Sequence, residues 1–130
     1  MLISPHSNNL PLSPPAASAW IRRTLADSIR SRNPFAVNLL LGGFDTTTSL
    51  PHLYWIDYLG TKAVVPYAAH GLGVYVSLST MDKYWYEGIE REEALDVLRK
   101  CIAEAAHREF SPLFNGADIS KGWYRTLAST

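Results

Sequence analysis

The amino-acid sequence predicts a fold of the α+β class, in which helices and strands occur in separate blocks of the chain. Two segments show the apolar periodicity of amphipathic helices, and three apolar or aromatic segments of strand length lie between them. Helices and strands do not alternate strictly, as they would in a parallel α/β sheet. The 130 residues, of which 47% are hydrophobic and 18% charged, suffice for one globular domain, expected over residues 14–130.

The first predicted helix covers residues 14–31. It begins at Ser13 followed by Pro14, because a serine hydroxyl can cap the first turn and proline is tolerated at the first helical position. Apolar and small residues recur on one face of this segment. The helix should end before Pro34, since the residue before a proline avoids the helical conformation. The preceding residues 1–13, rich in serine, asparagine and proline, are expected to form a loop or a disordered N-terminus.

Three strands are predicted after this helix. The run FAVNLLLGGF at residues 35–44 has almost no polar interruption, which is typical of a strand buried on both faces. Gly42 and Gly43 near its end indicate a bulge or the close approach of another backbone. The polar segment DTTTSLPH forms the turn to an aromatic strand at residues 53–59, and TKAVVPY forms a short third strand that ends at Pro66.

The second half of the chain contains one ambiguous segment and one clear helix. Residues 71–86 carry valine and tyrosine, so local propensity favours a strand, although some of their apolar residues also share one helical face. Residues 90–109 show an apolar stripe at helical spacing, with acidic residues near the start and basic residues towards the end, as the helix dipole favours. The tail gives weak signals, with a strand expected at 114–119 and a turn near Gly122.

The charges and the single cysteine limit the classes of function. Twelve basic and twelve acidic residues cancel, which argues against binding to nucleic acid or to an anionic membrane. Cys101 alone cannot form an internal disulfide, which fits a reducing compartment. No apolar run approaches the roughly 18 residues of a membrane span, and the N-terminal residues lack the regions of a signal peptide. We therefore expect a protein of the cytosol or the nucleus, without membrane or nucleic-acid partners.

Several segments together resemble the β subunits of the proteasome. LSPPAASAWIRRTLADSIRSRNPFAVNLLLGGFD is similar to the second helix and following strand of that family, and LYWIDYLGTKAVVPYAAHG is similar to its next strands. GVYVSLSTMDKYWYEGIEREEALDVLRKCIAEAAHREF resembles its last two helices, with the family's Glu-Glu-Ala motif beginning at Glu92. ALDVLRKCI and AAHG resemble the non-catalytic β type-2 subunits, at the fourth position of the β ring. The resemblance covers roughly residues 12–110.

The resemblance implies a fold and a set of motif positions. The fold is a four-layer α-β-β-α sandwich of the N-terminal nucleophile hydrolase type, expected to be incomplete because the family's opening strands and first helix have no counterpart in this sequence. Residues 71–85 should form a helix, against their local propensity. The positions that match family motifs, and for which we expect structural roles, are Gly43, Asp45, Tyr54, Asp57, Gly60, Thr61, His70, Gly71 and Asp82.

The family's nucleophile has no match in this sequence. Active members of the family are proteases that use an N-terminal threonine, whose free amine is the base for its own hydroxyl. The resemblance therefore implies that the chain as given is not an enzyme and has no catalytic residues. Thr61 and Lys62 have the right chemical types, but they match an interior strand position. Cys101 with His70 or His107 is another candidate, and the place of the cysteine on an apolar stripe indicates an inert, buried thiol.

The remaining residues favour assembly over chemistry. The histidines lack metal-ligand spacing and no phosphate-binding glycine motif is present, so no metal or cofactor is expected. The partners implied by the resemblance are other β subunits and the α ring, in a particle of two β and two α rings. Buried interface centres favour aromatic and arginine side chains, and the candidates are Trp20, Arg22, Arg23, Tyr84, Trp85 and Tyr86.

Three functional hypotheses follow from the sequence. The first is a non-catalytic structural β subunit of the 20S proteasome core particle, which serves ubiquitin-dependent protein degradation. The second is a threonine-type endopeptidase subunit whose catalytic N-terminal part is missing from this sequence. The third is an unassembled fragment that acts as a small binding module.

Overall fold

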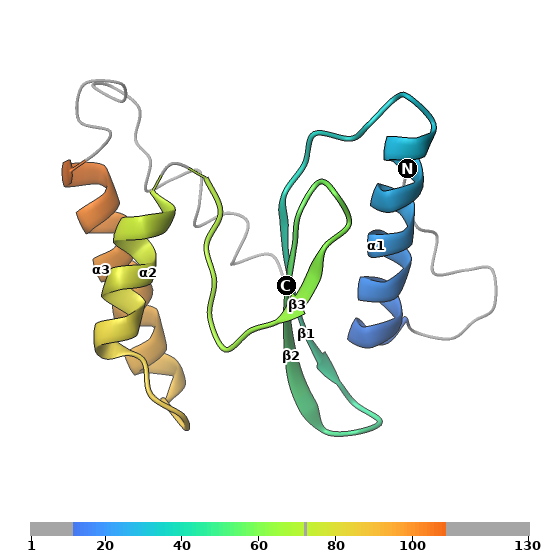
Figure 1. The fold of residues 1–130 in the computed structure, drawn as a ribbon. Coiled ribbons are helices and arrows are strands. Elements are labelled where there is room, and N and C mark those ends of the chain that lie inside the picture. Colours follow the sequence, from blue (N-terminus) through green and yellow to red (C-terminus); the bar gives the residue numbers. More distant parts are fainter. Residues whose placement is uncertain (1–11, 72, 109–130) are drawn as a thin grey trace. The chain divides into compact units, whose positions relative to one another are not determined.

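The computed structural model describes residues 12–71 and 73–108 of the chain. Its elements follow the order α1, β1, β2, β3, α2 and α3, and the chain divides into two compact units at residues 1–70 and 71–130. The first unit holds α1 and a three-stranded antiparallel sheet, and the second holds α2 and α3 (Figure 1). Helices and strands thus occur in separate blocks, which confirms the predicted α+β class.

Helix α1, Pro14–Arg30, begins at the predicted residue and ends within one residue of the expected position. The Ser13 side chain accepts a hydrogen bond from the backbone N–H of Ala16 at 3.4 Å, which satisfies one of the free donors of the first turn. Beyond the helix, Arg32 has a φ of 60°, a left-handed conformation that takes the chain out of the helical path.

The sheet has the strand order β1-β2-β3, with both pairs antiparallel. All three predicted strands exist, but their bounds differ from those expected. The bounds are Leu39–Asp45 for β1, Leu50–Ile56 for β2 and Lys62–Val64 for β3. Strand β2 begins inside the expected turn, because Leu50 already pairs with Asp45. Pro51 is tolerated in this strand because β3 does not extend alongside it.

The glycine pair in β1 marks a close approach and not a bulge. Gly42 lies opposite Leu53 and Gly43 opposite His52, in a register without an extra residue, so the predicted bulge is wrong. A Cβ atom added at Gly43 would lie 2.8 Å from Cγ of Pro14, well inside van der Waals contact. The approaching group is thus a side chain of α1 and not a backbone, and only glycine leaves room for it.

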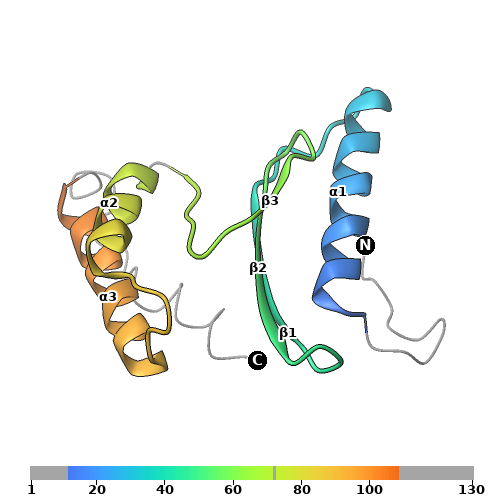
Figure 2. The ribbon, with the colours of Figure 1, turned by 60° about the horizontal axis from the view of Figure 1, so that its bottom comes forward.

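Helix α1 covers one face of the sheet (Figures 1 and 2). Leu25 of the helix packs against Tyr54 and Ile56 of β2, with Ile21, Leu39 and Leu41 partly buried around them. Side chains alternate along a strand, so Leu40 and Phe44 lie on the other face, where they are 45% and 60% exposed. The prediction that this strand is buried on both faces is therefore wrong for the described chain, because α1 supplies cover for one face only.

The second unit is a pair of helices that pack side by side (Figures 1 and 2). Helix α2 is Val74–Tyr84, which confirms the helix implied by the family resemblance against the local strand propensity. Helix α3 is Arg91–Arg108, within one residue of the predicted bounds at each end. The buried side chains of the pair are Met81, Val97 and Cys101. In the described part of the chain, neither these helices nor α1 has the length and apolar character to cross a membrane.

The predicted strand at 114–119 and the turn near Gly122 lie outside the described residues, as do residues 1–11 of the expected N-terminal loop.

Candidate functional site

The family-motif residues of the first unit build the turn between β2 and β3. Oδ1 of Asp57 accepts hydrogen bonds from the backbone N–H groups of Leu59, at 3.0 Å, and of Thr61, at 2.8 Å. The backbone N–H of Asp57 donates to the carbonyl of Thr61 at 3.1 Å, so the turn is closed from both sides. One aspartate side chain therefore fixes the direction in which β3 leaves the turn.

Gly60 lets this turn pack against α1. Its φ is 83°, a left-handed conformation that costs other residues free energy. It is buried, and an added Cβ atom would lie 3.0 Å from the carbonyl oxygen of Arg22 and 3.1 Å from Cβ of Ala26. Both the conformation and the contact require glycine, so the Gly-Thr of the motif is a docking point between the sheet and the helix.

A buried polar contact joins the same helix to β3. Nζ of Lys62 donates to Oγ of Ser18 at 3.1 Å and lies 5.1 Å from the centre of the Tyr54 ring. Ser18 is completely buried, and its hydroxyl donates in turn to the carbonyl of Pro15 at 2.8 Å. The amine and hydroxyl have the chemical types of a nucleophile and its base, yet no substrate can reach a serine without exposed surface. The contact is structural.

Sequence reasoning missed this pair. It weighed Lys62 with its neighbour Thr61, whereas the partner in the structure is Ser18, 44 positions away. A serine among the apolar residues of an amphipathic helix was the available signal, since a buried hydroxyl needs a hydrogen-bond partner. Thr61 itself has its N–H and carbonyl in the Asp57 turn, so its amine is a peptide nitrogen, as expected for an interior position.

Further motif residues hold the segments that flank the sheet. His70 stacks on Trp55 with ring centres 4.9 Å apart, and its Nε2 lies 3.1 Å from the carbonyl of Leu39. Gly71 follows with a φ of 93°. These contacts tie the chain after β3 back onto β1 and β2, so the AAHG segment anchors the end of the first unit.

Asp45 closes the turn between β1 and β2. Its Oδ1 accepts a hydrogen bond from the N–H of Thr47 at 2.8 Å. This hydrogen bond is the main cause that holds the pKa of Asp45 below its ordinary value, with a smaller opposing effect from burial. Both aspartates of the first unit's motifs therefore act as acceptors for backbone N–H groups in turns.

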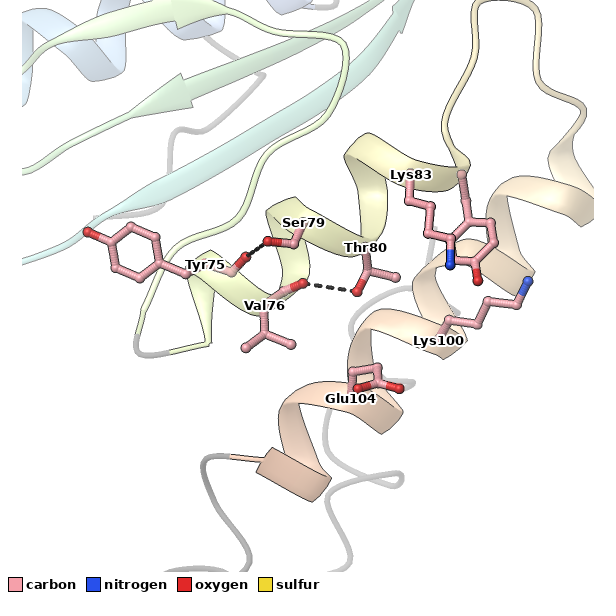
Figure 3. A pocket seen from close by; sticks show the side chains of 8 residues that line it. Tyr75, Val76, Ser79, Thr80, Lys83, Lys100 and Glu104 are labelled. Carbon is pink, nitrogen blue, oxygen red and sulfur yellow. Dashed lines mark hydrogen bonds between the residues drawn. The ribbon is translucent and has the colours of Figure 1, made fainter.

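The aromatic candidates of the second unit gather at the end of α2. The ring of Tyr84 lies 5.1 Å from Nζ of Lys83 and 4.2 Å from Nζ of Lys100. These side chains line a cavity of about 400 Å³ on the helix pair (Figure 3). The Ser79 and Thr80 hydroxyls of its wall donate to carbonyls of their own helix, so they are already satisfied.

Tyr86 follows α2 and contacts the first turn of α3. Its hydroxyl donates to Oε2 of Glu93. This hydrogen bond is the main cause that raises the pKa of Tyr86 above its ordinary value, with smaller contributions from burial and the charges of Glu93 and Glu90. Asp82 is exposed near the end of α2.

The six predicted interface residues fall into two groups. The side chains of Trp20, Arg22 and Arg23 are exposed on α1, and of these residues Arg22 also contacts the sheet's turn through its backbone. In the second unit Tyr84 and Tyr86 are exposed, and Trp85 between them is half-buried. Each group comes from one short segment of the chain, and the role of its members as an interface stays a prediction.

The remaining chemical candidates are inert in the described residues. Cys101 is buried, its thiol lies 3.6 Å from the carbonyl of Ser77, and burial raises the pKa of the thiol. Among the described residues of the second unit, no contact of this sulfur with His107 is found, and the pairing with His70, which belongs to the first unit, stays a prediction. Within residues 12–71 and 73–108 no three metal-ligating side chains lie close enough together to hold an ion.

Comparison with known proteins identifies the family. The model of the family "Proteasome subunit" matches residues 4–118. The "Probable proteasome subunit beta type-4" of Meyerozyma guilliermondii is 48% identical over 107 residues, which are 82% of this chain and 55% of the relative. The "Proteasome subunit beta type-4" of Saccharomyces cerevisiae is 46% identical over 97 residues, 75% of this chain and 49% of the relative. The "Proteasome subunit beta type-2-B" of Arabidopsis thaliana is 42% identical over 101 residues, 78% of this chain and 50% of the relative.

The resemblance inferred from the sequence is thus confirmed. The chain spans about half the length of the curated relatives that it matches. These relatives carry the names of β type-4 and β type-2 subunits, and the matched residues include both units of the fold. The chain belongs to the proteasome subunit family.

Proposed function

We propose that the chain is a non-catalytic structural β subunit of the 20S proteasome core particle, which contributes to β-ring assembly for ubiquitin-dependent protein degradation in the cytoplasm and nucleus. The observation that carries the proposal is the family match over residues 4–118, together with relatives named as β subunits. The partners are other β subunits and the α ring. The peptide bonds are cut by other subunits of the same particle.

The geometry of the motif residues supports a structural role. Asp57, Gly60 and Lys62 serve the packing of α1 on the sheet through hydrogen bonds and close contacts within the fold. The Asp57 carboxylate is directed at the chain's own backbone, and the Lys62 amine at the buried hydroxyl of Ser18. Residues with these roles stabilise the fold and do not catalyse a reaction.

The uncovered face of the sheet supports a four-layer architecture for the complete domain. Leu40 and Phe44 lie exposed on this face, and Trp55 on the same face is half-buried beneath His70. A sheet that is apolar on both faces requires cover on both. In the proposed sandwich, a second sheet covers it.

The exposed aromatic and arginine residues support contacts with neighbouring subunits. Trp20 is 36% exposed on α1, beside Arg23. Tyr84 and Tyr86 are exposed in the second unit. Aromatic rings and guanidinium groups provide large contact areas and several hydrogen bonds when a partner covers them.

An epitope-tagged chain, captured from cells of its source under native conditions, tests the proposal. We expect mass spectrometry of the captured material to identify the α and β subunits of the proteasome. The variant Trp20→Ala/Arg23→Ala should reduce this recovery several-fold, because it removes two interface side chains without touching the core. Arg30→Ala, on the same helix and paired with Asp27, is the matched control and should retain it. Capture without proteasome subunits would overturn the proposal.

A further inference from the structure

Two lysine side chains of the second unit converge on one exposed ring. Nζ of Lys83, on α2, lies 5.1 Å from the centre of the Tyr84 ring, and Nζ of Lys100, on α3, lies 4.2 Å from it. Figure 3 shows both side chains beside this ring, in the wall of the cavity on the helix pair. Two positive charges therefore meet where the surface of α2 and α3 is hollowed.

These charges are not neutralised by an ion pair within the helix pair. Three acidic residues of α3 pair with other groups: Glu92 with Arg91, Glu93 with Tyr86 and Asp96 with Arg99. In residues 73–108 neither Lys83 nor Lys100 forms an ion pair, and Glu104 is the one acidic residue among those that line the cavity. The lysines thus leave an excess of positive charge at this end of the cavity.

The cavity suits an acidic side chain better than a free anion. Like charges that share one site repel each other, and a carboxylate between them replaces the repulsion by attraction. The cavity, of about 400 Å³, is also lined by the ring of Tyr75 and by Val76, which favour methylene groups over water. Because the hydroxyls of Ser79 and Thr80 are bonded within α2, the two ammonium groups are left to recognise a polar ligand.

We propose that Lys83 and Lys100 bind the carboxylate of an aspartate or glutamate on a neighbouring subunit, next to the Tyr84 ring. The inference rests on the proposed function, which places the chain among other subunits, and it names the chemistry of one contact. Each ammonium donates to the carboxylate, and such charge-assisted hydrogen bonds are stronger than neutral ones. Tyr84 is already a predicted interface residue, and the structure adds the two lysines to it.

Zero-length cross-linking tests the contact. The epitope-tagged full chain, captured from cells of its source under native conditions, is treated with a carbodiimide, which joins a lysine amine and a carboxylate in direct contact as an amide. We expect peptide mass spectrometry to find Lys83 or Lys100 joined to an aspartate or glutamate of another subunit. Lys62, whose amine donates to Ser18, is the matched control and should form no such link.

The cross-linking result separates this inference from the proposed function. Captured proteasome subunits without a link to either lysine, or with links only to carboxylates of the same chain, would overturn the inference alone. Capture without proteasome subunits would overturn the proposed function and the inference together.

Reversal of one charge tests whether the contact contributes to binding. Lys100→Glu should reduce recovery of the cross-linked subunit several-fold, whereas Lys100→Arg keeps the charge and should retain it. Arg30→Glu, an equal change of charge at an exposed position of α1, is the matched control and should also retain it. Circular dichroism verifies the helix content of each variant. Recovery with Lys100→Glu as high as with Arg30→Glu would contradict the proposal.

Discussion

The contacts that stabilise the first unit differ in kind from those that stabilise the second. In the first, α1 and the sheet meet through contacts that require one residue type, such as Gly60 against the backbone of Arg22 and Lys62 on Ser18. In the second, α2 and α3 pack through Met81 and other apolar side chains, with the thiol of Cys101 directed at the carbonyl of Ser77.

Backbone geometry therefore determines which residue can stand at a position of the first unit, whereas hydrophobicity and size determine it in the second. Eight of the nine predicted motif positions, from Gly43 to Gly71, lie on or next to the first unit, where turns and close approaches dictate the residue. Helix packing in the second unit tolerates any apolar residue of suitable size. Single substitutions should therefore be more disruptive in the first unit than in the second.

The largest effect is expected at the centre of the first unit. Ile56 is completely buried, and Ile56→Ala should lower the free energy of unfolding by ~4 kcal/mol, because a cavity replaces its side chain. Met81, 5% exposed on α2, is the matched buried position of the second unit, and Met81→Ala should cost ~2 kcal/mol, at the lower end for such a substitution. Urea unfolding followed by circular dichroism measures both. Equal losses would contradict the contrast between the units.

The next effect compares two glycines with nearly the same backbone. Gly60 has a φ of 83° and Gly88 a φ of 85°, but only Gly60 has atoms against the position of a Cβ. Gly88→Ala should cost ~1 kcal/mol from its conformation alone. Gly60→Ala should cost ~3 kcal/mol, since a clash with the α1 backbone adds to the strain. The same unfolding experiment applies, and a loss at Gly60 no larger than at Gly88 would show that the close approach is unimportant.

A smaller effect is expected in the turn that carries the motif aspartate. Asp57→Ala removes the acceptor of two backbone N–H groups and should cost ~2 kcal/mol. Asp57→Asn keeps a side-chain oxygen in that position and should lose less than half as much. Amide exchange of Thr61 reports the turn directly. If both variants exchange like the parent chain, the side chain does not hold the turn.

The smallest effects concern pH and have opposite signs in the two units. The pKa of Asp45 is lowered in the folded chain, so its stabilising contribution is present above the ordinary value of 3.8 and is lost as the pH falls through the folded pKa. The pKa of Tyr86 is raised, so its contribution is present below the ordinary value of 10.0 and is lost as the pH rises through the folded pKa. Asp45→Asn should flatten the acid limb of a melting-temperature profile and Tyr86→Phe the alkaline limb. A variant that flattened the other limb would refute the assignment.

Local sequence signals predicted the elements that have local causes. Ser13 and Pro14 define the start of α1, and the apolar stripe with its charge gradient defines α3. Helix α2 has no such cause: valine and tyrosine favour a strand, and packing against α3 through Met81 overrides that preference. Only the family resemblance predicted this helix.

The site was predictable in part for the same reason. The resemblance predicted structural roles for Asp57 and Gly60, and both lie in the turn between β2 and β3. The turn itself was not predicted, because the aromatic strand was expected to run to residue 59 and ends at Ile56. The contact of Lys62 with Ser18 depends on how α1 lies on the sheet, which no local pattern specifies. The bulge expected at Gly42 was wrong because a glycine pair has the same sequence signature whether it bends a strand or admits a neighbouring helix.

The native size of the complex that contains the chain tests the central claim most directly. The chain would be captured from its source with an antibody to residues 52–66, separated by native size, and weighed as an intact polypeptide. The proposed assembly predicts that it migrates within a very large particle. A 14.5 kDa chain that migrates alone would contradict the claim that it functions as a proteasome β subunit.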